Sequence, residues 1–199
     1  MKSFAIVVAL AALAAGCAQP AQMSAMIAPV TSQTILPENS PLRNNVAVHI
    51  VTGGKETSPM WMSQVSTDDF QEALKLSLRQ HTILGAFDAP LRIEANLIDL
   101  DQPIMGFDMT VTAHARYIVR TEDGETAFDR TFVSPFTADF SSNFLGAERL
   151  RLANEGAVKK SIAEFISALV KDAAADPTRY GAPPAADPAP APGSAAQTS

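Results

Sequence analysis

The sequence has one cysteine, Cys17, among 199 residues, so no disulfide can form within the chain. A free exposed thiol would be a liability in an oxidising compartment, so this cysteine needs a specific role. Basic residues are also scarce, with 15 lysines and arginines against 21 aspartates and glutamates and a formal net charge of -6. An acidic chain of this kind lacks the electrostatic footprint of a nucleic-acid-binding protein, so we predict no nucleic-acid partner.

Motifs of the common enzyme classes are missing as well. Gly53-Gly54-Lys55 looks like part of a phosphate-binding loop, but Glu56 stands where that loop needs Ser or Thr, and His49 stands where it needs its first glycine. The sequence has no G-x-S-x-G elbow and no Rossmann glycine pattern. We therefore predict no catalytic residues and a protein that is not an enzyme.

A metal site is not indicated either. The 3 histidines fall in different predicted elements, and none has a ligand spacing such as H-x-x-x-H. Asp99, Asp101 and Asp108 flank one loop and could hold a cation, although solvated loop acids are the simpler interpretation. We expect no metal and no cofactor other than covalent lipid.

The N-terminus has the pattern of a signal peptide. Lys2 precedes an apolar run from Phe4 to Ala15, which is shorter than the roughly 20 residues of a membrane-spanning helix. Ala14-Ala15-Gly16-Cys17 resembles the bacterial lipobox, with alanine where leucine is usual. This resemblance implies cleavage before Cys17, a diacylglycerol thioether on its sulfur and a further acyl chain, such as palmitate, on the freed amine.

We therefore expect residues 1–16 to be a signal peptide and Cys17 to be the lipid attachment site. The alternative is an ordinary secreted protein with a stray cysteine. Ala18 follows the cysteine, whereas aspartate there would resemble an inner-membrane retention signal. The expected location is the outer membrane, with the protein lipid-anchored and facing the periplasm.

Composition divides the rest of the chain. Residues 17–42 contain four prolines and no sustained period, which predicts an acylated cysteine followed by a flexible tether. Residues 176–199 are rich in Pro and Ala, which predicts a disordered tail. Between them, residues 43–175 are long enough for one domain with a single core.

Hydrophobic periodicity within the domain predicts the order β-α-β-β-β-α. Alternation predicts strands at 45–51, 91–100, 107–120 and 126–136, and a helical period predicts helices at 67–83 and 146–171. The strand at 107–120 has one apolar face, which begins at Phe107, and one polar face. Gly156 inside the second helix indicates a close approach to the sheet. The predicted fold class is α+β, a two-layer sandwich with a mostly antiparallel four-stranded sheet and two helices on one face.

An acylated cysteine, a short tether and this element order together resemble LptE, the lipoprotein of lipopolysaccharide assembly, and more loosely the CsgG and LpoB envelope lipoproteins. The resemblance implies a non-enzymatic assembly or accessory subunit in cell-envelope biogenesis. Because it depends on element order, it transfers no functional residue.

Apolar residues in two connections are candidate contacts for an envelope protein partner. Trp61 lies in a long strand-to-helix loop and either plugs one end of the sandwich or contacts a partner. Aromatic residues before the second helix, Phe136 among them, either cover the sheet edge or offer an apolar patch to a partner or to lipid. The candidate partner-binding residues are Met60, Trp61, Met62, Phe140, Phe144 and Leu145.

An alternative function is a lipid or small-ligand carrier. It predicts a deep apolar pocket between the helices and the sheet, lined by residues such as Met109 and Phe165. Hydrolytic activity at the envelope would need a convergent polar cleft, which the sequence does not indicate.

Overall fold

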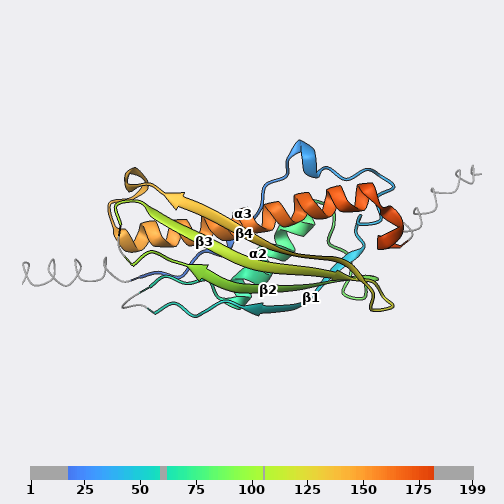
Figure 1. Cartoon of the computed structure of the whole chain (residues 1–199), viewed down its shortest axis with the longest axis horizontal. Helices are drawn as coiled ribbons and strands as arrows, with labels where there is room; N and C mark the ends of the chain where they lie inside the picture. The colour runs from blue at the N-terminus through green and yellow to red at the C-terminus, as the bar shows by residue number, and fades with distance from the viewer. Residues whose placement is uncertain (1–17, 59–61, 105, 182–199) are drawn as a thin grey trace, which may run out of the picture.

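The computed structural model describes residues 18–58, 62–104 and 106–181. These residues form one four-stranded sheet and two α-helices, and both helices lie on the same face of the sheet (Figure 1). The elements are β1 (Val46–Gly53), α2 (Thr67–Gln80), β2 (Leu91–Asp101), β3 (Met109–Arg120), β4 (Thr126–Ala138) and α3 (Gly146–Ala175). The predicted α+β class and element order are confirmed.

The sheet is mixed, because β1 pairs with β2 in parallel and the other neighbours pair in antiparallel fashion. Helix α2 makes the crossover that returns the chain for the parallel pair. Its start has the predicted cap, since the Ser66 hydroxyl accepts from the Asp69 amide at 3.1 Å and donates to the Asp69 carboxylate at 2.6 Å.

Side chains at alternate positions of β3 form the centre of the core. From Met109 to Val119 every second residue is buried, while the opposite face of the strand is partly or fully exposed. Phe165 of α3 stacks on Tyr117 with ring centroids 4.2 Å apart. One expectation for this strand is wrong: Phe107 is 82% exposed, because β3 begins at Met109 and the residues before it form a bend.

The close approach inferred at Gly156 is present. The Phe136 ring of β4 lies directly over this glycine, and a β-carbon added there would overlap the ring. This contact also settles which way β4 faces, because Phe128, Arg130 and Phe132 lie on the helix side together with Phe136. Arg130 reaches the carboxylate of Asp172 in α3 at 3.1 Å.

The segment predicted as a flexible tether is instead packed onto the domain. Residues 21–42 contain two short 3-10 turns, η1 (Met23–Met26) and η2 (Ser32–Thr34), and their apolar side chains join the core. The Ala28 amide donates to the Ser77 hydroxyl of α2 at 2.9 Å. Prolines limit regular structure in this segment, but isolated apolar residues such as Met26 and Leu42 are still fully buried in the core.

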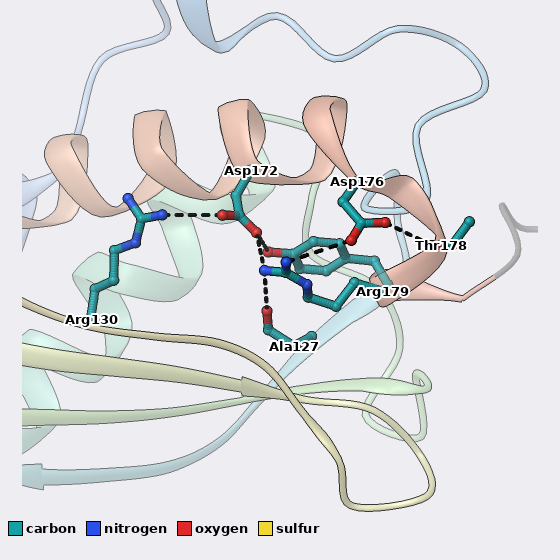
Figure 2. Close-up of polar contacts among 7 residues, drawn as sticks. Ala127, Arg130, Asp172, Asp176, Thr178 and Arg179 are labelled. Atoms are coloured by element: carbon teal, nitrogen blue, oxygen red, sulfur yellow. Dashed lines mark hydrogen bonds and ion pairs between the residues drawn. The ribbon is translucent and has the colours of Figure 1, made fainter.

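The C-terminal boundary also lies later than predicted. The chain continues beyond Asp176 as a 3-10 turn, η4 (Pro177–Tyr180), with Tyr180 buried. Figure 2 shows how Asp172 gathers this end: its carboxylate accepts from Tyr180 at 2.6 Å and pairs with Arg130 and Arg179, each at 3.1 Å. The predicted signal peptide, Cys17 and the tail from residue 182 lie outside the described residues. In the described part of the chain, neither helix combines the length and apolarity needed to cross a bilayer.

Both tyrosines of the chain, Tyr117 and Tyr180, are buried, and we predict that neither ionises in the native protein near pH 10. Burial raises the pKa of both hydroxyls, and the neighbouring Asp172 carboxylate raises that of Tyr180 further. The unfolded chain loses these protons at about pH 10 and the folded chain keeps them, so stability falls as the pH rises above that value. Absorbance at 295 nm should stay flat and then rise in one step with alkaline unfolding.

The control for this titration is the same protein in denaturant, where both tyrosines should titrate smoothly near pH 10. A native titration of one tyrosine near pH 10, with the circular dichroism unchanged, would contradict the burial of that residue.

We predict that Gly156→Ala destabilises the protein, although alanine is the better helix former by about 1 kcal/mol. The added methyl group has to displace the Phe136 ring, and overpacking of this kind costs about 1–3 kcal/mol, so a net loss of about 1 kcal/mol should appear in urea unfolding. Combining it with Phe136→Leu should recover part of the loss. A gain in stability equal to the helix propensity alone would show that the ring does not pack there.

Candidate functional site

Large apolar side chains gather at one end of the sandwich and remain exposed. They come from the β2–β3 connection and from the β4–α3 connection, which meet where β3 begins and β4 ends. The most exposed are Ile104 at 97%, Phe107 at 82% and Phe144 at 83%. We call this surface the apolar tip; it consists of Ile104, Phe107, Phe140, Phe144 and Leu145.

The aromatic rings of the apolar tip hold fixed positions relative to one another. Phe140 is central, with edge-to-face contacts to Phe107 and Phe144 at centroid distances of 6.0 Å and 5.7 Å. The guanidinium of Arg149 lies 5.0 Å from the centroid of the Phe140 ring, which is cation–π geometry.

Polar groups behind the rings lock both connections. Arg149 is buried and donates to the carbonyl oxygens of Asn143 at 2.7 Å and Gly106 at 3.4 Å, so it joins the two loops. Asp108 accepts from the Phe140 amide at 2.9 Å. The apolar tip is therefore a built surface rather than a set of free loop residues.

A buried polar network lies behind the apolar tip. Asn154 of α3 is fully buried. Its side-chain Nδ2 donates to the Ser63 carbonyl at 2.9 Å, and its Oδ1 accepts from the Gln102 side chain at 2.7 Å. Gln102 also donates to the Ser63 carbonyl and is within hydrogen-bond distance of Gln64. These contacts join α3, the β2–β3 connection and the end of the strand-to-helix loop.

The neighbouring residue of α3, Glu155, binds the N-terminal segment to this network. Its carboxylate is almost fully buried and accepts from the Gln22 amide at 2.7 Å, while the Ala21 amide donates to the Gln64 carbonyl at 3.1 Å. Arg151 balances the charge by pairing with both Glu155 and Glu148. Burial disfavours the charged guanidinium, but the two carboxylates outweigh it and raise the pKa of Arg151.

The structure brings only some of the predicted contact residues together. Phe140, Phe144 and Leu145 lie in the apolar tip, whereas Met62 is about one-third exposed in the separate strand-to-helix loop, where its amide donates to the Ser58 carbonyl. Met60 and Trp61 lie outside the described residues, so both interpretations of Trp61 stay open. Ile104 and Phe107 were not among the predicted contact residues; the adjacent Pro103 and Gly106, which favour a turn, are the sequence signal that they lie in an exposed connection.

The carboxylates considered for a cation do not converge. The Asp99 carboxylate pairs with Lys55 at 3.4 Å, and the Asp108 carboxylate accepts from the Phe140 amide. The two carboxylates therefore bind different groups and do not face a common point. Within residues 18–58, 62–104 and 106–181, no three His, Cys, Asp or Glu side chains form a group suited to a metal ion.

The pocket expected for a carrier is filled. Phe165 is fully buried against Tyr117, and Met109 is buried at the end of the core near Gly146. A groove of about 560 Å³ does occur, but it is an open surface groove lined by α3, by Arg130 and Phe132 of β4, by His81 and by residues 29–34, and neither Met109 nor Phe165 lines it. The deep pocket lined by Met109 and Phe165 that a carrier was expected to have is therefore not found among the described residues.

No protein-family model and no curated protein matches the sequence. Solved structures resemble the fold. The protein XCC0632 from Xanthomonas campestris, of the family DUF330, superimposes with a TM-score of 0.53 at 12% identity, over 76% of this chain and 98% of that one. A candidate lipoprotein from Caulobacter crescentus CB15 gives 0.43 at 9% identity, over 66% and 91% of the two chains. The hypothetical protein CT253 from Chlamydia trachomatis gives 0.39 at 11%, over 68% and 95%. The likeness to XCC0632 shows a shared fold and does not define a function.

We predict that Glu155→Ala releases the N-terminal segment from α3. The substitution leaves the Gln22 amide without its acceptor and Arg151 without one carboxylate, which should cost about 1–3 kcal/mol. Hydrogen exchange at the Gln22 amide should accelerate about tenfold or more, since 1.4 kcal/mol corresponds to a factor of ten.

Glu148→Ala is the matched control, because Glu148 pairs with the same arginine but does not contact Gln22. Exchange at Gln22 should change little in this variant. Equal acceleration in both variants would mean that Arg151, rather than the Glu155 carboxylate, fixes the segment.

Proposed function

We propose that this chain is a lipoprotein anchored through Cys17 in the outer membrane, facing the periplasm, and that it serves as a non-enzymatic accessory or assembly subunit of the cell envelope. The observation that carries the proposal is the lipobox directly before a segment that packs onto the domain. A diacylglycerol on Cys17 would hold the whole domain, and not only a loose arm, at the membrane.

A structural role is also supported by the way the interior uses its polar groups. The Tyr117 and Ser161 hydroxyls are 3.1 Å apart, and Ser134 donates to Glu164 at 2.6 Å. Asn154 and Gln102 bond each other in the same manner. These groups satisfy one another between the layers, and of them only Glu164 lines the surface groove of about 560 Å³.

For a protein partner, the sheet offers the more extended surface. Strands β1 and β4 are the edges of the sheet, and Ile50 of β1, Ile98 of β2 and Val133 of β4 are exposed. Edge strands and mixed apolar and charged faces are common sites of protein association. The element order similar to LptE supports envelope biogenesis as the setting, with lipopolysaccharide assembly as its most specific form.

Replacing Cys17 by alanine should abolish acylation, because the thiol is the one side chain that can form the thioether. Metabolic labelling with a clickable palmitate should mark the wild-type protein and leave Cys17→Ala unlabelled, and the variant should leave the outer-membrane fraction. Labelling that survives the substitution would overturn the anchor.

Affinity purification after gentle detergent extraction tests the proposed role as an accessory or assembly subunit. The wild-type protein should recover an envelope partner in stoichiometric amount, and Cys17→Ala should recover less of it. Recovery of the wild-type protein strictly alone would contradict the accessory role while leaving the anchor intact.

A further inference from the structure

We propose that the apolar tip docks into the surface of the phospholipid bilayer that carries the Cys17 lipid, so that the domain rests on the membrane by this end. The inference rests on the lipid anchor proposed above. It adds a second membrane contact, made by side chains of the folded domain.

The position of the first described residues sets the distance between anchor and domain. The Ala21 amide is bonded to the strand-to-helix loop and the Gln22 amide to Glu155, so the chain is fixed at these residues. Cys17 lies four residues before Ala21. Fully extended chain covers at most about 3.6 Å per residue, so the acylated cysteine lies within about 14 Å of Ala21.

The apolar tip lies at this same end of the molecule. Glu155, which holds Gln22, and Arg149, which lies beneath Phe140, are on one helix, and six residues of helix advance about 9 Å. In Figure 1 the described chain begins at the end where the β2–β3 and β4–α3 connections meet. The β3–β4 hairpin and η4 lie at the opposite end, beyond the length of β3.

The backbone of the apolar tip is prepared for an apolar environment. Peptide groups that enter lipid without a hydrogen-bond partner are costly. The carbonyl groups of Asn143 and Gly106 accept from Arg149, the Phe140 amide donates to Asp108, and the Leu145 amide donates to the Asn143 side chain at 2.9 Å. Four backbone polar groups of the loops that carry Phe107 and Phe144 are therefore already bonded within the protein.

The exposed side chains suit the interfacial region of a bilayer. Aromatic and large aliphatic groups enter the boundary between headgroups and acyl chains, and contiguous exposed patches of this kind mark interaction sites. The nearby charges do not form a basic surface, because Arg149 is buried and Asp108 and Asp139 are exposed. Insertion should therefore depend on apolar contact and change little with salt.

The short connection to Cys17 is the reason to favour lipid over a protein partner at this surface. An anchored tip is always within reach of the bilayer, at a high effective concentration. A protein partner would have to enter the space between the tip and the membrane.

The test uses the acylated full-length chain in vesicles of phosphatidylethanolamine and phosphatidylglycerol. Acylation consumes the only natural thiol, so Phe144→Cys supplies a single site for an environment-sensitive fluorophore. Asp123→Cys, exposed in the far hairpin, is the matched control. We expect a blue-shifted spectrum at position 144 and about threefold stronger quenching by spin-labelled lipid there than at position 123, with little change at high salt.

Two results would overturn the proposal. Equal, weak quenching at both positions would place the tip in water. A blue-shifted label at position 144 that spin-labelled lipid does not quench would mean that protein, either a partner or a second copy, covers the tip.

Mass spectrometry of the same sample separates this inference from the proposed anchor. If Cys17 carries no acyl chains, the anchor is wrong, and the tip is then tested with Cys17→Ala in the Phe144→Cys background, added to preformed vesicles. Lipid quenching at position 144 would support the proposal that the apolar tip contacts lipid, and the absence of quenching would reject that proposal.

Discussion

The buried carboxylate of Glu155 joins the N-terminal segment to the last helix. By accepting from the Gln22 amide it fixes the first described residues against α3, and apolar side chains such as Met26 and Leu42 pack the rest of this proline-interrupted segment into the core. A charge this well buried is tolerable only with a partner and further hydrogen bonds, and Arg151 with the Gln22 amide supplies them. Asn154 beside it bonds the strand-to-helix loop and the β2–β3 connection. One turn of α3 therefore contacts three parts of the chain that are distant in sequence: the N-terminal segment, this loop and this connection.

Helix α3 also connects the two ends of the sandwich. Near its start, Arg149 fixes the loops of the apolar tip; in the middle, Phe165 fills the core against Tyr117; near its end, Asp172 fastens β4 and η4. Gly156 leaves room for the Phe136 ring of β4 against this helix. A helix of this length gives the domain one end near the proposed anchor and one end away from it.

The sequence predicts the layered fold because the fold depends on local periodicity. The alternating burial in β3 and the helix capped by Ser66 are present in the structure nearly as the sequence predicts them. The packed segment around Gln22 could not be predicted, because its key bond spans 133 residues and no local pattern encodes it. For the candidate site, clustered aromatics identified Phe140 and Phe144, but alternation placed Phe107 in the core. Only the bend before Met109 turns that ring outward to join them.

Together with the proposed lipid on Cys17, these contacts imply a domain that sits directly on the membrane rather than at the end of a tether. Neutron reflectometry of the acylated protein on a supported bilayer measures this directly, as the depth of any water layer between headgroups and protein. The account predicts protein density that begins within the headgroup layer. A flexible tether over residues 18–42 would allow a gap of about 25–30 Å, and a water layer of that depth would contradict the account.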